Sequence, residues 1–325
     1  MRQKPDGWVR EDFPLTRKYD MGAMGSSFFF RGRTGWASVN YIDGVMFNTT
    51  GYDLLVYDPQ SGWSLDAAHA APEEDLNLVS LFAPQQDVLW LTAVSYGHLW
   101  LNFSLWAYVN GAPVHVAPGT NGYMYMDFSA PDNGYFVGFQ GLEYSLVGHF
   151  NGTGIQQMTI PPEFAEGAFW NIWLISEDEG FFLWTDPSWS WGELLHMHDG
   201  QWEAVAAPPG CADPGIVYAW RVGGSAMPDY DYLIIPVFSS GNNDTLWEYS
   251  GGQWTCREQE EMTRIVSTLP LRDGRVFLLG IRDGNAVLYE MFADRLEAIE
   301  LPLSDFTPAC LLAVGPLAPR YRICN

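Results

Sequence analysis

The chain has 325 residues, of which 47% are hydrophobic and 15% aromatic, so it contains enough apolar material for a large buried core. Its formal net charge is −23, because 39 Asp and Glu residues stand against only 16 Lys and Arg. A surface this acidic repels phosphate backbones and anionic lipids, so we expect no nucleic-acid partner. No stretch reaches the ~18 consecutive apolar residues that span a bilayer. Residues 1–20 are charged throughout, so the sequence predicts neither membrane insertion nor a visible secretory signal.

The first segment of the chain resembles the end of a repeat. "PDGWVRED" at 5–12 has near-copies in "HDGQWEAV" at 198–205 and "GGQWTCRE" at 251–258. In those later copies the Gly and Trp follow a strand-like run and begin a short fourth strand. We therefore interpret residues 1–12 as the outermost strand of a repeat unit whose other strands come from elsewhere in the chain.

Six strand-like segments carry a leucine at the same place, and their mean spacing is about 47 residues, which is typical of propeller blades. The six leucines are Leu54, Leu105, Leu146, Leu194, Leu246 and Leu288. The unit over 168–206 divides into four short aromatic-rich and β-branched runs, separated by Gly, Pro and acidic turns. Asp199-Gly200 is typical of a type I′ hairpin turn, in which both central residues have positive φ. No long segment shows a 3.6-residue period with caps, so we expect almost no helix.

These patterns predict an all-β protein, a β-propeller formed by a single domain over 1–325. Seven four-stranded blades fit the length, with a closing blade built from about 1–12 plus 306–325, so that strands from both ends of the chain close the ring. Only six leucine-bearing strands are visible, so six blades remain the alternative.

The sequence pattern of the units resembles that of bacterial repeat β-propellers with kelch-like or Asp-box-like blades. The resemblance rests on "SEDEGFFLW" (176–184), "HMHDGQW" (196–202) and "EYSGGQW" (248–254). It implies a propeller fold but little about function, because such folds host many roles. We interpret "SEDEG" as a turn sequence rather than a reactive site.

The four cysteines have no CxxC spacing, which argues against a zinc or redox site. Cys310 with Cys324, and Cys211 with Cys256, are the two pairs we expect to approach each other. Four N-x-S/T sequons, at Asn48, Asn102, Asn151 and Asn243, slightly favour an extracytoplasmic or secreted location.

The sequence contains no recognisable catalytic motif and predicts no cofactor. His196 and His198 lie two apart on an expected strand and therefore face the same way. Apolar residues occupy the second of these positions in sister units, so we interpret it as a packing position and expect no metal.

Exposed tryptophans suit sugar rings or a protein partner, because they combine a flat apolar face with an N–H donor. "TDPSWSWGE" at 185–193 places two tryptophans in a connecting loop. The candidate ligand-binding residues are Trp189, Trp191, Asp186, His98, Asp229 and Tyr230.

We therefore expect a non-catalytic recognition or scaffold propeller that binds a carbohydrate or a protein on one loop face. The alternative is a glycoside hydrolase or lyase with carboxylates in the central funnel. The sequence favours binding over catalysis, because the acidic residues are dispersed and no nucleophile motif is present.

Overall fold

The computed structural model describes residues 2–4, 7–9, 23–24, 26–31, 34–42, 49–58, 60–66, 77–85, 88–96, 101–117, 122–140, 144–188, 192–209, 211, 225–227, 232–237, 245–258, 264–270, 275–282, 285–292, 295–299 and 322–324. These residues form antiparallel strands, and the sole helix among them is the 3₁₀ turn η2 (Pro162–Phe164). The expectation of an all-β protein is confirmed for this part of the chain. No described helix could span a bilayer.

Six sheets of four or more strands follow one another along the chain. The first contains β4 (Ser26–Arg31), β5 (Thr34–Ile42), β6 (Thr49–Asp58) and β7 (Gly62–Leu65), joined by β28 (Arg322–Cys324) and β3 (Ala23–Met24). The second contains β8 (Asn77–Gln85), β9 (Val88–Tyr96), β10 (Leu101–Val109) and β11 (Ala112–Ala117). The third contains β12 (Tyr123–Ala130), β13 (Asn133–Gln140), β14 (Tyr144–Phe150) and β15 (Ile155–Gln157).

The remaining three sheets repeat this meander. The fourth contains β16 (Ala168–Leu174), β17 (Glu179–Thr185), β18 (Gly192–His198) and β19 (Gln201–Ala204). The fifth contains β20 (Ser225–Met227), β21 (Tyr232–Val237), β22 (Thr245–Ser250) and β23 (Gln253–Glu258). The sixth contains β24 (Arg264–Pro270), β25 (Val276–Arg282), β26 (Asn285–Met291) and β27 (Leu296–Ile299).

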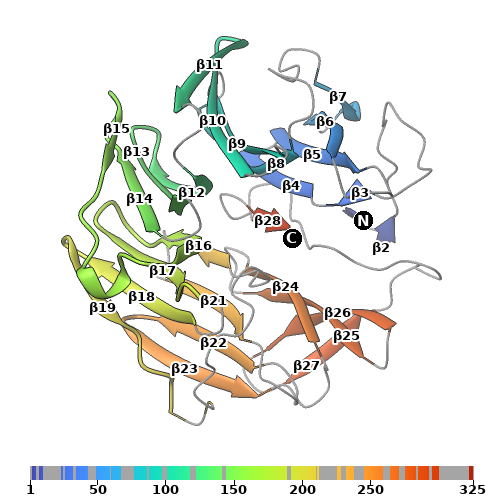
Figure 1. Cartoon of the computed structure of the whole chain (residues 1–325). Coiled ribbons are helices and arrows are strands. Elements are labelled where there is room, and N and C mark those ends of the chain that lie inside the picture. The colour runs from blue at the N-terminus through green and yellow to red at the C-terminus, as the bar shows by residue number, and fades with distance from the viewer. Residues whose placement is uncertain are drawn as a thin grey trace.

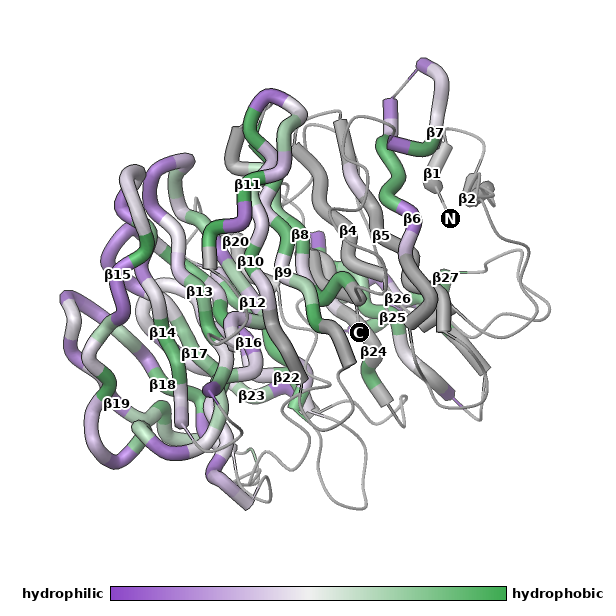
Figure 2. Tube along the Cα trace, turned by 45° about the horizontal axis from the view of Figure 1, so that its top comes forward, coloured by the Kyte–Doolittle hydropathy of each residue, from purple (hydrophilic) through white to green (hydrophobic). Residues whose placement is uncertain are grey.

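The sheets are arranged around a common centre, as Figure 1 shows. The first strand of each sheet contacts the first strand of the next, from β4 through β8, β12, β16 and β20 to β24. The first strands are therefore innermost and the fourth strands lie at the outer rim. In Figure 2 the middle strands carry most of the hydrophobic residues, whereas many of the turns are hydrophilic.

The two ends of the chain pair differently from our expectation. Strand β2 (Gly7–Val9) forms a small hairpin with β1 (Arg2–Lys4), in which Gln3 lies opposite Trp8. The C-terminal strand β28 pairs with β4. Among the described strands, therefore, no pairing joins the two ends to each other. Residues 306–321 lie outside the described residues, so a closing blade and the seventh sheet that it would form remain predictions.

The hairpin turns between third and fourth strands follow the sequence prediction. Asp199 and Gly200 have φ values of 50° and 74°, as a type I′ turn requires. Asn110 and Gly111 repeat this geometry with φ values of 51° and 76°. This turn brings the fourth strand directly back along the third.

The tryptophan after each such turn occupies one register position. Trp63 lies opposite Tyr57, Trp202 opposite Met197, and Trp254 opposite Tyr249. Each tryptophan therefore lies opposite the penultimate strand of its own sheet, as the repeat predicts. Trp63 and Trp254 contact the tyrosine there, whereas the rings that Trp202 contacts belong to the second and first strands. Nothing is described of the side chain of Trp8.

One leucine of the repeat, Leu146, faces the opposite side of its sheet from Leu194. Leu146 packs with Trp90 and Phe136, against the preceding sheet. Its neighbour Ser145 accepts a hydrogen bond from Trp184 Nε1 of the following sheet, at 3.0 Å. Successive residues of a strand face opposite sides, so Val147, not Leu146, occupies the position of Leu194. The cause is a longer loop: Phe150 pairs with Ile155 across four residues, whereas His198 pairs with Gln201 across two.

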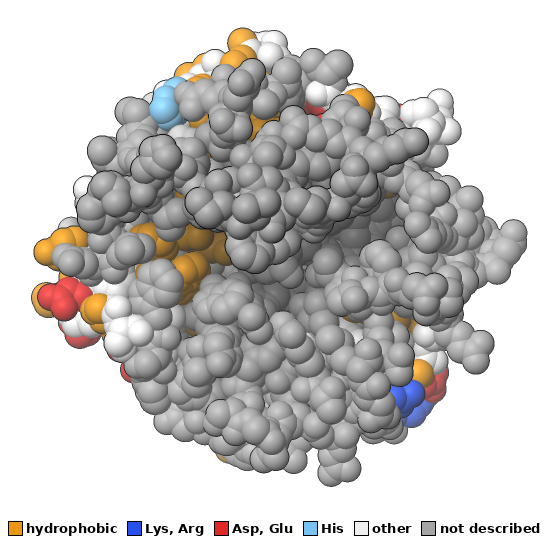
Figure 3. All heavy atoms as spheres, turned by 45° about the vertical axis from the view of Figure 1, so that its right-hand side comes forward, with side chains coloured by type: hydrophobic (Ala, Val, Ile, Leu, Met, Phe, Trp, Pro, Cys, Tyr) orange, Lys and Arg blue, Asp and Glu red, His pale blue; other side chains and the backbone are white. Residues whose placement is uncertain are grey.

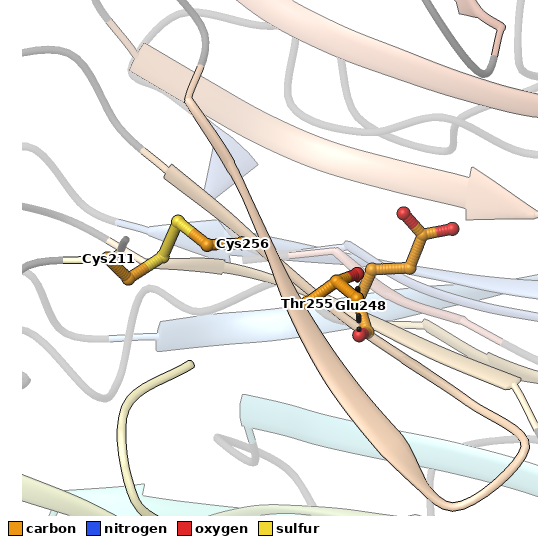
Figure 4. Close-up of a disulfide and its surroundings, with 4 residues drawn as sticks. All are labelled: Cys211, Glu248, Thr255 and Cys256. Atoms are coloured by element: carbon orange, nitrogen blue, oxygen red, sulfur yellow. Dashed lines mark hydrogen bonds between the residues drawn. A yellow bond between two sulfur atoms is a disulfide. The ribbon is translucent and has the colours of Figure 1, made fainter. Parts of the chain in front are cut away.

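A disulfide joins Cys211 to Cys256, with Cα atoms 5.5 Å apart, which confirms the second expected pair. Cys211 follows the fourth sheet and Cys256 lies within β23, so the bond links neighbouring sheets at the rim. Figure 4 shows the bond on one side of β23, with the Glu248 carboxylate pointing away from it. Cys310 lies outside the described residues, so its pairing with Cys324 remains a prediction.

Candidate functional site

Of the six ligand-binding candidates, only Asp186 lies among the described residues. It follows β17 directly, and its carboxylate accepts a hydrogen bond from the Ser188 hydroxyl. This contact is local, between residues two apart in the sequence. The other five candidates, Trp189, Trp191, His98, Asp229 and Tyr230, lie outside the described residues.

A different constellation emerges from the strand register. In four consecutive sheets, a polar residue at the start of the second strand, or just before it in the case of Arg275, is paired with a polar residue on the third strand, always along the same diagonal of the ladder. We call these the diagonal pairs. They are Asn133–His149, Glu179–His196, Tyr232–Glu248 and Arg275–Glu290.

The spacing within the pairs is consistent with direct interaction in three of them. His149 Nε2 lies 2.5 Å from Asn133 Oδ1, and His196 Nε2 lies 2.8 Å from Glu179 Oε1. The Tyr232 hydroxyl donates to Glu248 Oε1 at 2.9 Å. In the fourth pair, Arg275 Nη1 and Glu290 Oε1 are 3.9 Å apart, a looser ion pair.

An aromatic ring accompanies each pair. His149 stacks on Tyr135 with ring centroids 4.5 Å apart, and His196 stacks on Phe181 at 4.6 Å. The Arg275 guanidinium lies 5.7 Å from the Phe277 ring centroid. The remaining pair contains its own ring, that of Tyr232. Each pair thus combines hydrogen-bonding groups with an aromatic ring, and the rings of Tyr135, Phe181 and Phe277 are themselves buried.

The pairs of the third, fourth and fifth sheets face the following sheet. The Tyr135 hydroxyl donates to the backbone carbonyl of Glu177, in the turn between β16 and β17, at 3.3 Å. The Tyr249 hydroxyl on β22 donates to Glu179 Oε1 at 3.4 Å. The pairs therefore lie where one sheet meets the next, toward the ends of the strands that carry the hairpin turns.

The fourth sheet has the most elaborate version, which we call the His196 cluster: Glu179, Phe181, His196, Glu203, Tyr249 and Trp254. His196 lies between two carboxylates, since its Nδ1 is also 3.2 Å from Glu203 Oε1. The side chains of His196 and Glu179 are 18% and 19% exposed, whereas Glu203 is 76% exposed. The cluster therefore extends from a half-buried pair to an exposed carboxylate at the rim.

The rings of the next sheet complete this cluster. Phe181 contacts Trp254 edge-on at 5.1 Å and Tyr249 at 4.8 Å between centroids. Trp254 is the tryptophan that follows the Gly-Gly turn at 251–252. The repeat thus places the same indole that packs on its own sheet beside the polar groups of the preceding one.

The fifth sheet adds a cation to its pair. Arg257 Nη2 lies 3.1 Å from Glu248 Oε2, and Arg257 Nη1 donates to the Phe292 carbonyl of the sixth sheet at 2.7 Å. Burial and the neighbouring Glu248 carboxylate raise the pKa of Tyr232, so its hydroxyl remains a donor.

The pair in the third sheet is electrically neutral. Burial lowers the pKa of His149, although the nearby Asp178 carboxylate partly opposes that effect. The neutral imidazole then meets a neutral amide, and the Asn133 amide also donates to the Glu177 carbonyl at 3.0 Å.

His196 and His198 do point the same way, with ring centroids 6.1 Å apart. Both nitrogens of His196 face carboxylates, and His198 Nδ1 lies 3.2 Å from Asp199 Oδ2. Among the described residues, no group of three or more His, Cys, Asp or Glu side chains is arranged to hold a metal ion.

The sequence contains a periodic pattern that predicts these pairs, although we expected the site residues in the connecting loops. The third-strand member lies two residues after each in-phase apolar position, as His196 does after Leu194 and Glu248 after Leu246. In the first two sheets this position is apolar, Val56 and Ala107. Because Leu146 faces the opposite side of its sheet from Leu194, the leucine spacing did not reveal that His149 is equivalent to His196 and Glu248.

The sheets and their order around a common centre define a β-propeller-like all-β fold. No protein-family model matches the sequence, and neither does any curated protein. The structural neighbours are β-propeller proteins. One is the lectin BP39L from Burkholderia pseudomallei, with a TM-score of 0.55, 10% identity, and coverage of 85% of this chain and 84% of that one.

Two further neighbours have similar scores. The lectin SapL1, in complex with alpha methyl fucoside, gives a TM-score of 0.52 at 10% identity, over 88% of this chain and 98% of that one. A puromycin-hydrolyzing peptidase from Mycobacterium tuberculosis gives 0.54 at 9% identity, over 88% of this chain and 55% of that one. This chain therefore spans just over half of the peptidase. At such identities the likeness concerns the fold, and the kelch-like and Asp-box-like resemblance remains a prediction.

Proposed function

We propose that the protein recognises glycans without cleaving them, and that it does so with the diagonal pairs at the sheet-to-sheet contacts. The observation that carries this proposal is the His196 cluster. It offers two carboxylates, an imidazole and a phenol beside the rings of Phe181 and Trp254, and part of it reaches solvent. Sugar rings require this combination, because their hydroxyls need donors and acceptors and their C–H faces pack on aromatic rings.

The inner strands support binding over hydrolysis. Glycoside hydrolysis needs two carboxyl groups flanking one bond. Asp127 is the single carboxylate of the described first strands, it is fully buried, and two backbone N–H groups already donate to it. A catalytic pair in the central funnel would therefore need residues outside that set.

The fold neighbours are consistent with this function, since BP39L and SapL1 are lectins and the SapL1 structure contains alpha methyl fucoside. The disulfide between Cys211 and Cys256 favours an oxidising, extracytoplasmic location, where such ligands occur. The loop residues Trp189 and Trp191, with Asp186, remain a proposed second contact surface.

A panel of immobilised neutral and charged glycans tests the proposal with the full chain. We expect binding, with no cleavage of the bound sugars detectable by chromatography after prolonged incubation. His196→Ala should weaken binding strongly, because it removes the group that bridges both carboxylates, and a thermal melt should establish that the variant is folded. The control Ser64→Ala changes an exposed residue of β7 in a sheet that lacks a polar diagonal pair.

Loss of binding in Trp189→Ala and Trp191→Ala, with His196→Ala unaffected, would assign recognition to the loop instead. Release of shortened sugars would contradict the non-catalytic part of the proposal.

A further inference from the structure

An asparagine is followed by a glycine at four places in the chain, at Asn110, Asn121, Asn133 and Asn151. In this dipeptide the next backbone nitrogen reaches the side-chain amide most easily, because glycine has no side chain in the way. Such an attack joins two groups of one chain, so local geometry strongly influences its rate. Asn121 lies outside the described residues, and the other three asparagines have different surroundings.

Asn110 has the most open surroundings of the three. It lies with Gly111 in the two-residue turn between β10 and β11, and both residues are exposed. The Asn110 side chain makes no hydrogen bond with another described residue. The Gly111 N–H makes no backbone hydrogen bond within the described part of the chain. The amide and the nitrogen that would attack it are therefore exposed, and no described partner competes for them.

The hairpin that carries this turn is uncharged. Residues 101–117 contain no Asp, Glu, Lys or Arg. Val109 precedes the turn and Val114 lies on β11, and these side chains are 41% and 49% exposed. Figure 3 shows hydrophobic side chains at the top of the molecule, where Figure 1 has β11, with a histidine side chain nearby. A carboxylate formed in the turn would be the first acidic group of this hairpin.

Asn151 is equally exposed, but its own loop holds its side chain. Asn151 Oδ1 accepts hydrogen bonds from the Thr153 hydroxyl at 2.8 Å, the Thr153 N–H at 3.2 Å and the Gly154 N–H at 3.3 Å. Any rotation of this side chain toward the Gly152 nitrogen therefore breaks hydrogen bonds.

Asn133 is held at both ends of its amide. Its Nδ2 donates to Ser129 Oγ at 2.7 Å and to the Glu177 carbonyl at 3.0 Å, and its Oδ1 faces His149 Nε2. Gly134 lies within β13, which is paired with strands on both sides. The Asn133 amide can react only if its diagonal pair is disrupted.

We propose that Asn110 is a site of spontaneous deamidation, and that hydrogen bonds protect Asn133 and Asn151 from the same reaction. The Gly111 nitrogen bonds to Asn110 Cγ, the Cγ–Nδ2 bond breaks, and ammonia leaves with the Gly111 amide proton. Water then opens the five-membered imide at either carbonyl, which leaves aspartate or isoaspartate at position 110. No oxidation or reduction takes place.

The products change both the charge and the backbone of the hairpin. Each product adds one carboxylate, and isoaspartate also lengthens the main chain of a turn that fits two residues of ordinary length. Aged molecules therefore carry a charged hairpin with a disturbed tip. This inference is independent of glycan recognition.

The test is incubation of the folded full chain in mildly alkaline buffer prepared with heavy-oxygen water, followed by peptide mapping with mass spectrometry. The label marks each carboxylate that forms during incubation. We expect Asn110 to react about tenfold or more faster than Asn133 and Asn151, because each hydrogen bond that must break slows the reaction a few-fold. Equal rates at the three residues, or an Asn110 that does not react, would overturn the proposal.

The same measurement in guanidinium chloride shows whether the fold is the cause. The three rates should converge in the unfolded chain, and a difference that persists there would assign it to the sequence alone. Thr153→Val removes the hydroxyl donor of Asn151 at an exposed position. Deamidation at Asn151 should then rise a few-fold, with Asn110 in the same sample as the internal standard. An unchanged rate at Asn151 would contradict protection by hydrogen bonds.

Discussion

Asp127 Oδ2 accepts the backbone N–H of Leu174 at 2.7 Å and so joins β12 to β16, the first strands of two successive sheets. The other carboxylate oxygen accepts the N–H of Phe128, and Asp127 is fully buried. A buried carboxylate is costly unless its oxygens are hydrogen-bonded, so this group is tolerated because two amides satisfy it. The contact fixes how far one sheet lies from the next near the centre of the molecule.

Asp127→Ala should therefore lower the free energy of unfolding by about 2–5 kcal/mol, because it leaves two buried N–H groups without an acceptor. Asp127→Asn retains one acceptor oxygen and should cost less. Urea unfolding measures both. Asp132→Ala, at an exposed turn position of the same sheet, should change the stability little; an equal loss there would contradict the explanation.

Stability should depend on pH through His149. Burial lowers its pKa below the usual 6.5, so in acid the unfolded chain binds a proton more readily than the folded one. Above pH 6.5 both states are neutral and the imidazole contributes no pH dependence. As the pH falls below 6.5 toward the lowered pKa, the folded state should lose stability.

Urea unfolding at about pH 7.5 and pH 5.5 brackets this window. The loss between the two should be smaller in His149→Gln than in the unsubstituted protein. His198→Gln is the control, because that side chain is 57% exposed. Identical pH dependence in all three proteins would show that His149 does not contribute.

The disulfide should stabilise the contact between the fourth and fifth sheets. Cys211 and Cys256 are 45 residues apart in sequence, and closing a loop of that size contributes about 2–4 kcal/mol. Cys211→Ser, Cys256→Ser and the double variant should all lose the same amount, since any of them removes the one bond. Thermal melts measure the loss, and additive losses would show that the two thiols act separately. Peptide mapping under non-reducing conditions checks the pairing itself.

The positive φ of the hairpin turns predicts a difference between two turn glycines. Gly200 has a φ of 74°, and a Cβ atom there would meet nothing within 4 Å. Gly200→Ala should therefore cost about 1–2 kcal/mol from backbone conformation alone. Gly154 is equally open but has no positive φ, so Gly154→Ala should be nearly neutral or slightly stabilising. Chemical denaturation distinguishes the two, and equal effects would contradict a conformational cause.

The local elements could be predicted from the sequence because each depends on a few neighbouring residues. The four strands of 168–206, the Asp199-Gly200 turn and the register position of Trp202 all follow from strand alternation and turn chemistry. These features are decided within a hairpin, where no distant partner intervenes. The pairing of Cys211 with Cys256 also followed, because the repeat placed both cysteines near the outer strands of neighbouring units.

The tertiary structure decided which face of a strand meets which neighbouring sheet, and which side chains come together between two sheets. A four-residue loop in place of a two-residue turn reversed the faces of β14, so Leu146 packs against the preceding sheet and His149 takes the place that the leucine spacing gave to Gly148. The repeat likewise predicted Trp254 as a packing residue, but its contact with Phe181, the ring on which His196 stacks, depends on how two sheets meet.

The two ends of the chain show the same limit. "DGWVRED" has the sequence pattern of an outer strand. Residues 7–9 nevertheless pair with residues 2–4, and the C-terminal strand pairs with β4. The sequence by itself determined the strands, the turns and the repeat, because hydrophobic alternation and positive-φ residues act locally. The strand that each end joins, and the polar groups that come together between sheets, were decided by the tertiary structure, because those contacts depend on the packing of segments far apart in the chain.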